Sequence, residues 1–331
     1  MSINKAKEFR NLFPMKRNIA IAVVSYSLAT TFLYMANINQ NSILILPWAL
    51  CFALTGNTIF SLLHESVHGT FCKNKFINNT FGRVSAAFFP TSFTLQQIFH
   101  LGHHKRNRTD AELFDQYYPK DSKFMKKFII YTLLTGFYWP SSPLANIIFL
   151  LCPWLFNNDF FRKNDLMKKA GFDDMLSGLD RKSAPQNLMR LEILFSISIQ
   201  AALIYTLSLS FKTWIICYWS FAVIWSSLQY TDHAWSKRDV RNGAWNLKVS
   251  LPVHMIWLNY HYHLNHHRDP NISWLYLPRL TRSSDANPSF WSIYFKLWKG
   301  PTPVSEVNPS CDLEFEKEIF EETLINDFRK K

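Results

Sequence analysis

The segment SLLHESVHGT, residues 61–70, contains two histidines four positions apart with a glutamate between them. On a helix, His64 and His68 would share one face, because positions i and i+4 are neighbours. With Glu65 they fit H-E-x-x-H, in which two imidazoles bind zinc and the glutamate is a general base. The segment also contains one E-x-x-H, the half-site of soluble di-iron bundles. A third interpretation needs only the two histidines, as one of several histidine boxes.

The other histidines fall into short groups. Two further boxes share the spacing H-x-x-H-H and consist of His100, His103, His104, His263, His266 and His267. His233 follows an apolar segment in QYTDHAW, and His254 and His261 complete the eleven. At this histidine content, one H-x-x-H-H arises by chance in about one of 80 chains, whereas H-x-x-x-H arises in roughly a third. The repeated H-x-x-H-H box is therefore the more specific signal.

The number of imidazoles limits the metal chemistry. Positions i, i+3 and i+4 of a helix lie on one side, so we expect each H-x-x-H-H to direct three nitrogens into one volume. Eight imidazoles from three boxes exceed the needs of one tetrahedral zinc ion. They suit two five- or six-coordinate metals with open positions for oxygen, and neutral imidazole is a good iron ligand. The carboxylate-bridged di-iron site of soluble helix bundles needs a second E-x-x-H motif, which this chain lacks.

The composition is typical of a membrane protein with large polar parts. Of the 331 residues, 18% are charged and 16% are aromatic, which is poor in charge for a soluble domain. The net charge is +12, but no nucleic-acid-binding motif accompanies it. The basic residues lie between apolar segments, as the positive-inside rule describes for cytoplasmic loops. The five cysteines form no C-x-x-C pair, so neither a disulfide framework nor a cysteine metal site is expected.

Four apolar segments are long enough to cross a bilayer as helices. They cover residues 18–36, 43–63, 191–211 and 213–230. Because the link within each pair is short, we expect an all-α integral membrane protein with four transmembrane helices in two hairpins. Both termini and all the boxes would then lie on the basic, cytoplasmic side.

We expect residues 1–331 to form a single membrane-bound domain. A cytosolic helical cap carrying the boxes would comprise residues 64–190 and 231–311, and residues 312–331 would form an acidic tail with an amphipathic helix. Prolines interrupt the apolar segment 128–156, and two crossings need about 40 residues. An interfacial or re-entrant helical pair is therefore expected there.

The three boxes, their order and the paired apolar segments resemble the membrane fatty acid desaturase and hydroxylase superfamily. The third box continues as NYHYHLNHHRDPNISWLYLP, which is similar to the family's H-x-x-H-H followed by a proline and an aromatic-Leu-Pro. HHKRNRTDAELFD, after the second box, resembles bacterial members, which favours a bacterial inner membrane over the endoplasmic reticulum. The resemblance covers about residues 43–280, most of the chain.

The resemblance implies a cytosolic cap with a non-haem di-iron centre above four transmembrane helices. It implies ligation by His64, His68, His100, His103, His104, His263, His266 and His267. A ninth ligand often follows the last span, and His233 matches that place. The family often has an asparagine four residues earlier, where this chain has Gln229, so the role of Gln229 stays open. Glu65 would orient an imidazole through its other ring nitrogen.

The family activity implied is O2-dependent oxidation of an unactivated C–H bond in a fatty acyl chain, with two irons as the cofactor. Desaturation is its most frequent form, and hydroxylation or oxidative decarboxylation to a terminal alkene are alternatives on the same site. The chain has no H-P-G-G, cysteine cluster or dinucleotide fingerprint. A separate electron donor is therefore expected, either a ferredoxin or a cytochrome b5 with its reductase.

Two other classes of function remain open. A zinc intramembrane protease of the H-E-x-x-H type would use His64, Glu65 and His68, but it leaves both H-x-x-H-H boxes unexplained. A non-enzymatic membrane scaffold would require that no box histidine matters for activity.

Several further polar residues lie beside the boxes without a fixed assignment. The aspartates, which either contact the metal ligands or are solvated, are Asp110, Asp232 and Asp269. Arg106 and Arg108 are expected to be ordinary positive-inside charges rather than a docking site for an acidic partner. We expect His254 and His261 to have structural roles outside the metal site.

Overall fold

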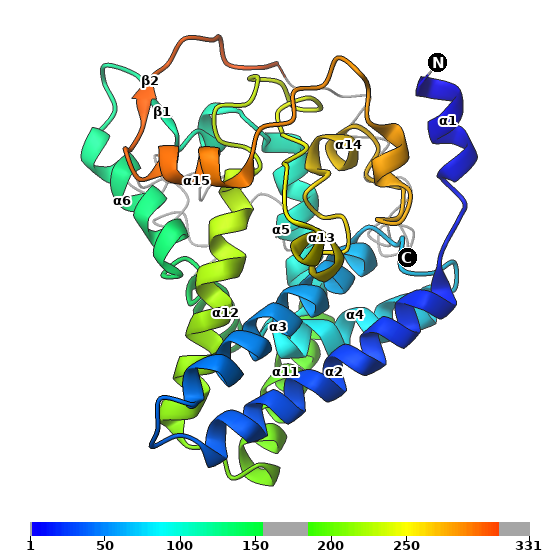
Figure 1. Cartoon of the computed structure of the whole chain (residues 1–331), viewed down its shortest axis with the longest axis vertical. Helices are drawn as coiled ribbons and strands as arrows, with labels where there is room; N and C mark the ends of the chain where they lie inside the picture. The colour runs from blue at the N-terminus through cyan, green and yellow to red at the C-terminus, as the bar shows by residue number, and fades with distance from the viewer. Residues whose placement is uncertain (1, 155–184, 311–331) are drawn as a thin grey trace.

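The structure is a computed structural model that describes residues 2–154 and 185–310. It is all-α, as expected. The strands in the described part are β1 (Gln116–Tyr117) and β2 (Thr302–Pro303), which pair in parallel. Figure 1 shows long helices at one end and short helices with irregular segments at the other. The expected acidic tail at 312–331 lies outside the described residues.

Four long helices form the first part. They are α2 (Met15–Ile38), α3 (Ile45–Val67), α11 (Gln186–Thr206) and α12 (Phe211–Thr231). Within the described residues, α2, α3 and α11 are long and apolar enough to cross a membrane. α12 lies where the fourth span was expected and has 21 residues, but it is rich in Trp, Tyr and Ser. Composition therefore identifies three candidate spans rather than four.

Two helix boundaries differ from the expected spans. α3 continues through His64 to Val67, because no glycine or proline lies between Gly56 and Gly69, whose φ of +73° ends the helical path. α11 begins at Gln186 and ends at Thr206, since Ser208 has a φ of +48° and starts the turn. His64 thus lies within the last turn of a long helix, and His68 caps its end.

α3 lies among the other long helices and packs against both α2 and α12. A Cβ on Gly56 would lie 2.8 Å from Cδ2 of Phe221, so α12 approaches α3 closely only because this residue is glycine. α11 packs on α4, α5 and α7. It is joined to α12 through Gln200, which donates to Tyr218 Oη at 2.7 Å and accepts from Trp214 Nε1 at 3.1 Å.

The turns after α2 and after α11 meet at one end of the molecule. Asn37 Nδ2 donates to the carbonyls of Leu207 and Ser208 at 3.3 and 3.0 Å. Lys212 Nζ donates to the carbonyl of Gln40 at 2.7 Å. These contacts fix the ends of the long helices relative to each other, far from the histidines.

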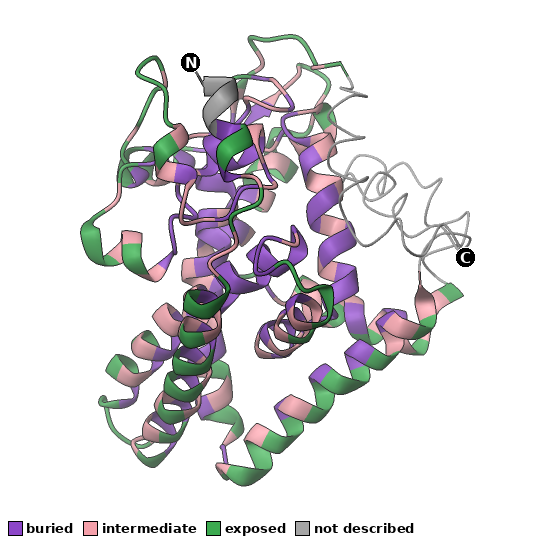
Figure 2. Ribbon diagram, turned by 90° about the vertical axis from the view of Figure 1, so that its right-hand side faces the viewer, coloured by how far each residue is buried: buried purple, intermediate pink, exposed green. Residues whose placement is uncertain are grey.

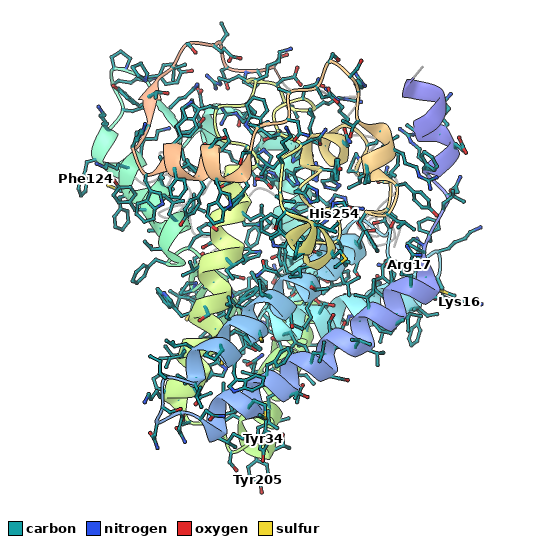
Figure 3. All side chains as sticks on the ribbon, viewed as in Figure 1. Lys16, Arg17, Tyr34, Phe124, Tyr205 and His254 are labelled. Atoms are coloured by element: carbon teal, nitrogen blue, oxygen red, sulfur yellow. The ribbon has the colours of Figure 1, made fainter. Side chains whose placement is uncertain are left out.

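The outer faces of the long helices are apolar. Val24 on α2 is 55% exposed and Leu191 on α11 is 64% exposed. In Figure 2 these outer faces are largely exposed, whereas the residues between helices are largely buried. Extended apolar surface of this kind suits lipid better than water. Figure 3 places Lys16 and Arg17 at one end of α2 and Tyr34 near the other.

Short helices surround the end of α3 that carries the first box. They are α1 (Ser2–Phe9), α4 (Lys75–Phe88), α5 (Phe93–Arg106), α6 (Lys123–Thr135), α7 (Ser141–Leu151), α13 (Leu251–Ile256), α14 (His263–Arg268) and α15 (Phe290–Leu297), with the 3-10 turns η1 (Asp110–Glu112) and η3 (Leu277–Leu280). Gly136, with a φ of +85°, separates α6 from α7. Both are too short to cross a bilayer, as expected for the apolar segment there. Their interfacial position stays a prediction.

A buried carboxylate fixes the start of α5, the helix that carries the second box. Glu192 of α11 is only 4% exposed. Its Oε2 accepts hydrogen bonds from Ser92 Oγ and the Thr94 backbone N–H, both at 2.8 Å, and its Oε1 accepts from Arg83 Nε at 2.8 Å. A negative charge that also satisfies a first-turn N–H stabilises a helix N-terminus. Glu192 therefore positions α5.

Candidate metal centre

The histidine boxes converge although the chain separates them by up to about 200 residues. His64 and His68 end α3, the second box lies in the last turns of α5, and the third box forms α14. His233 follows α12 directly. Figure 1 shows these elements gathered in the part of the molecule with the short helices.

The imidazoles form two clusters. The first contains His64, His68, His100 and His266, and the second contains His103, His233, His263 and His267. Within each cluster, one ring nitrogen of every residue lies within 4.8 Å of the others. His104 joins the first cluster, because its Nε2 lies 3.2 Å from His100 Nε2 and 3.1 Å from His266 Nε2. All nine expected histidines are thus brought together.

Each H-x-x-H-H box is divided between the two clusters, so the expectation that a box directs three nitrogens into one volume is wrong. On α5, His100 and His104 belong to the first cluster and His103 to the second. On α14 the i+3 residue, His266, belongs to the first cluster, and the other two box residues belong to the second. At 100° per residue, i+4 lies 40° from i, whereas i+3 lies 60° away on the opposite side. The i and i+4 residues therefore share a cluster.

The spacing of the nitrogens suits shared metal ions. His233 Nε2 lies 3.0 Å from His263 Nε2 and 3.2 Å from His103 Nε2. Two adjacent ligands with metal–nitrogen bonds of about 2.1 Å would be about 3.0 Å apart. Within the described part of the chain, buried Nε2 atoms of His64 and His267 have no hydrogen-bond partner. Closely packed imidazoles with unpartnered nitrogens fit a metal centre.

Burial also sets the protonation of these side chains. It lowers the pKa of His100, His266 and His267 well below the ordinary value, and neighbouring imidazoles lower it further. These three imidazoles are therefore neutral at pH 7, which is the form that binds metal ions.

Polar contacts fix the ring orientation in the second cluster. His103 Nδ1 lies 2.6 Å from Glu112 Oε2, and Arg106 Nε donates to Glu112 Oε1 at 3.2 Å. Burial opposes ionisation of Glu112, but His103 and Arg106 outweigh it and lower its pKa. His233 Nδ1 lies 2.8 Å from the carbonyl of Gly243. A ring that donates through Nδ1 leaves Nε2 free to bind a metal.

The model of the family described as fatty acid desaturase matches residues 41–297. This range is more than three quarters of the chain and contains all nine clustered histidines. The chain belongs to the fatty acid desaturase family. A search of curated proteins found no match. Membership implies an oxidoreductase associated with membranes and lipids, and the family's metal is iron.

Glu65 of this desaturase-family chain makes contacts other than those expected. Its Oε2 accepts hydrogen bonds from Thr70 Oγ1 and Ser273 Oγ, both at 2.8 Å, and its Oε1 accepts from the Trp274 N–H at 3.1 Å. These bonds tie the end of α3 to the segment after the third box instead of orienting an imidazole. A carboxylate engaged in this way is also poorly placed to activate water on a zinc ion, which weighs against the protease.

Gln229 lies one turn before His233 and contacts the centre indirectly. Its Oε1 accepts from Tyr260 Oη at 3.5 Å. The Tyr260 ring lies 4.9 Å from the His64 ring and 5.0 Å from the His263 ring, between the two clusters. Gln229 is thereby linked to both clusters through Tyr260.

The aspartates beside the boxes separate into two kinds. Asp110 accepts from Arg238 Nη2 at 2.7 Å, and Asp269 accepts from Arg10 Nη2 at 3.1 Å, so both make ion pairs outside the clusters. Asp232 instead lies against the second cluster and is fully buried. Glu112 was not among the expected residues, because spacing in HHKRNRTDAELFD does not distinguish it from Asp110.

The arginines after the second box differ from the expectation, whereas the two remaining histidines agree with it. Arg108 is not a solvated charge: it is 1% exposed and donates to Asp115 Oδ1 at 2.7 Å. Arg106 pairs with the carboxylate that orients a cluster histidine, as described above. His254 Nδ1 and His261 Nε2 lie 3.2 Å apart and outside both clusters, as expected.

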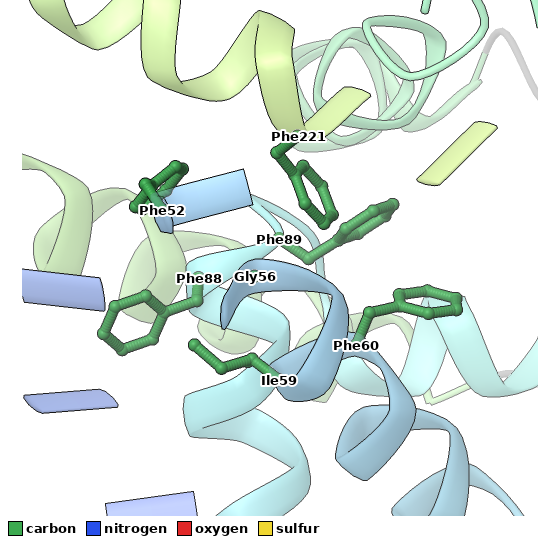
Figure 4. Close-up of a pocket in the computed structure, with 7 residues that line it drawn as sticks. All are labelled: Phe52, Gly56, Ile59, Phe60, Phe88, Phe89 and Phe221. Carbon is green, nitrogen blue, oxygen red and sulfur yellow. The ribbon is translucent and has the colours of Figure 1, made fainter. Parts of the chain in front are cut away.

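An apolar pocket lies beside α3 (Figure 4). It is lined by Phe52, Gly56, Ile59, Phe60, Phe88, Phe89 and Phe221. Gly56 precedes His64 by eight residues, which is about 12 Å along a helix. The Phe60 ring contacts the Tyr260 ring at 6.1 Å, so the aromatic lining continues to the histidines. Its lining is entirely hydrocarbon, and its empty volume of about 260 Å³ is smaller than that of a typical ligand pocket.

Proposed function

We propose that this protein is an integral membrane oxidoreductase that uses O2 to oxidise an unactivated C–H bond of a fatty acyl chain, with desaturation as the reaction. The observation that carries the proposal is the pair of clusters built from nine imidazoles within the range matched by the fatty acid desaturase family. Nitrogen ligands in this number suit two metal ions with open positions, rather than one closed zinc site.

The clustered residues would bind the two metal ions, and their neighbours would orient the imidazole rings. Five imidazoles would hold one iron and four would hold the other, as the two clusters divide them. Bound iron would supply the O2 chemistry that side chains alone lack. Glu112 and the Gly243 carbonyl would hold two rings in the metal-binding tautomer.

The acyl chain would enter along the phenylalanine-lined pocket beside α3, whose side chains would have to move apart to admit it. Such a pocket would exclude water and hold the chain in one position relative to the clusters. That position would decide the product. Loss of a second hydrogen gives an alkene, addition of oxygen gives an alcohol, and loss of the carboxyl carbon gives a terminal alkene.

We infer that α12 crosses the membrane together with the three more apolar helices, so that both turns face one side and the clusters face the other. The end-to-end contacts of Asn37 and Lys212 and the position of Lys16 and Arg17 at the other end of α2 support this orientation. The termini would be cytoplasmic, in a bacterial inner membrane. Electrons would come from a separate ferredoxin, or from cytochrome b5 with its reductase.

Gas chromatography–mass spectrometry of lipids and hydrocarbons from a host expressing the chain with each donor tests the proposal. The His267→Ala variant is the inactive counterpart, and His254→Ala, outside both clusters, is the matched control. A new acyl double bond in the parent and in His254→Ala, absent from His267→Ala, is the expected result. A hydroxylated acid, or an alkene one carbon shorter, would support the proposed metal centre but show that the reaction is hydroxylation or decarboxylation rather than desaturation. Purified protein that holds only zinc and forms no product with either donor would overturn the proposal.

A further inference from the structure

Asp232, the residue before His233, is a buried carboxylate that the proposed centre does not yet use. The residue is 0% exposed. Within the described residues, neither of its carboxylate oxygens has a hydrogen-bond partner. Such a group is costly, because a carboxylate removed from water needs a positive charge or donors in compensation.

The carboxylate faces the second cluster. Its Oδ2 lies 3.6 Å from His263 Nε2, and its Oδ1 lies 3.8 Å from His233 Nε2. These separations are too long for hydrogen bonds. They fall between the values of about 3.0 and 4.2 Å expected for adjacent and opposite ligands of one metal with bonds of about 2.1 Å. The same two Nε2 atoms already lie 3.0 Å from each other.

Other carboxylates near the boxes have protein partners that account for their burial. Glu65 accepts hydrogen bonds from two hydroxyls and a backbone N–H, and Glu112 is paired with Arg106 and His103. Asp115 is paired with Arg108. Asp232 differs from these because the atoms that approach its oxygens belong to two cluster imidazoles, and a metal ion between them would supply the missing charge.

We propose that Asp232 is a metal ligand, and that its carboxylate binds the metal ion held by His103, His233, His263 and His267. The inference rests on the proposed metal centre and makes that centre asymmetric: one metal would have imidazole ligands alone, and the other would have four imidazoles and an anionic oxygen. Carboxylate is a harder donor than imidazole, so the second site stabilises the more oxidised metal.

The test is an anaerobic titration of metal-free, detergent-solubilised full-length protein with Fe(II). The parent is compared with Asp232→Asn and with Asp269→Asn, a matched control that follows the third box and pairs with Arg10 instead. We expect two tight sites in the parent and in Asp269→Asn. In Asp232→Asn we expect one unchanged site and one weakened at least about tenfold, with altered Mössbauer parameters for that iron alone.

Thermal unfolding separates ligation from a structural role. Because an unpaired buried carboxylate destabilises the metal-free fold, metal-free Asp232→Asn should melt at the same temperature as the parent or higher, while the stabilisation by Fe(II) should be smaller. Two sites of unchanged affinity and Mössbauer spectrum would overturn the inference, and so would a metal-free variant that fails to fold. A parent that binds no iron would instead overturn the proposed function itself.

Discussion

The two histidine clusters use the same ligand type in different surroundings. The first is built on α3, α5 and α14 and lies beside Tyr260 and the phenylalanine-lined pocket. The second replaces α3 with the residue after α12, and its neighbours are Glu112, Asp232 and the Gly243 carbonyl. The first is therefore the better placed to meet an apolar substrate. In the second, polar contacts orient the rings of His103 and His233.

The division of each box explains how one helix serves both clusters. α5 contributes an i, i+4 pair to the first cluster and its i+3 residue to the second, and α14 does the reverse. A shift of either helix would therefore disturb both clusters at once. Glu192, which holds the start of α5, acts on both sites although it touches neither.

The largest effect is expected from removing one imidazole from either cluster. His104→Ala and His263→Ala should each reduce product formation by roughly a thousandfold or more, and the double variant should be no worse than either alone, because residues that act as a unit are not additive. Product per unit of folded protein measures this, with His254→Ala as the control. Substantial turnover after loss of only one cluster would contradict the coupling of the two sites.

A smaller and one-sided effect is expected at Glu112. Glu112→Gln keeps the shape but removes the charge beside His103, so iron affinity should fall about 10–100-fold at the second cluster alone. Fe(II) titration with Mössbauer detection measures the two sites separately. Asp110→Asn, two residues away and bonded to Arg238, should change neither site. Equal weakening of both clusters would show that Glu112 acts on the fold of α5 instead.

The sequence predicted which histidines come together better than it predicted their surroundings. The four long helices and eight of the nine histidines follow from apolar segments and box spacing, which are local properties of the chain, whereas His233 was indicated by the family resemblance. The partners of Glu65 and Glu112 do not, because they depend on which loops pack against the end of α3 and after α5. Arg108 was expected in solvent for the same reason: its partners, Asp115 and Tyr230, meet it only in the folded structure.

Acid should destabilise the metal-free protein through the same histidines. Burial lowers the pKa of His104 and His267 in the folded state, while the unfolded value is about 6.5. The unfolded chain then binds more protons below pH 6.5, so stability is intact above that pH and falls as the pH drops. Each such histidine contributes a loss of up to about 1.4 kcal/mol per pH unit.

Melting temperatures of metal-free protein at pH 7.5, 6.5 and 5.5 measure this effect. His267→Asn removes one of the titrating groups and should flatten the dependence below pH 6.5, whereas Asp269→Asn should leave it unchanged. A melting temperature that stays constant down to pH 5.5 would mean that these imidazoles are protonated or hydrated in the metal-free fold.

The smallest effect is expected at Gly56, and it tests whether the first cluster is the one that faces substrate. A Cβ there lies 2.8 Å from the Phe221 ring, so Gly56→Ala narrows the pocket that we assign to the acyl chain. One methylene in an apolar pocket is worth about 1–3 kcal/mol, so the preference should move toward acyl chains shorter by one or two carbons, by about tenfold. Iron content is measured in the same variant, because the new Cβ would also meet the Phe221 ring on α12, the helix that ends beside His233. A loss of iron would show that the substitution disturbs the packing of α12 rather than the pocket. Leu50→Ala, on the exposed face of the same helix, should leave the product profile unaltered. An unchanged chain-length profile in Gly56→Ala would place the substrate elsewhere, and the contrast between the two clusters would then rest on their polar contacts alone.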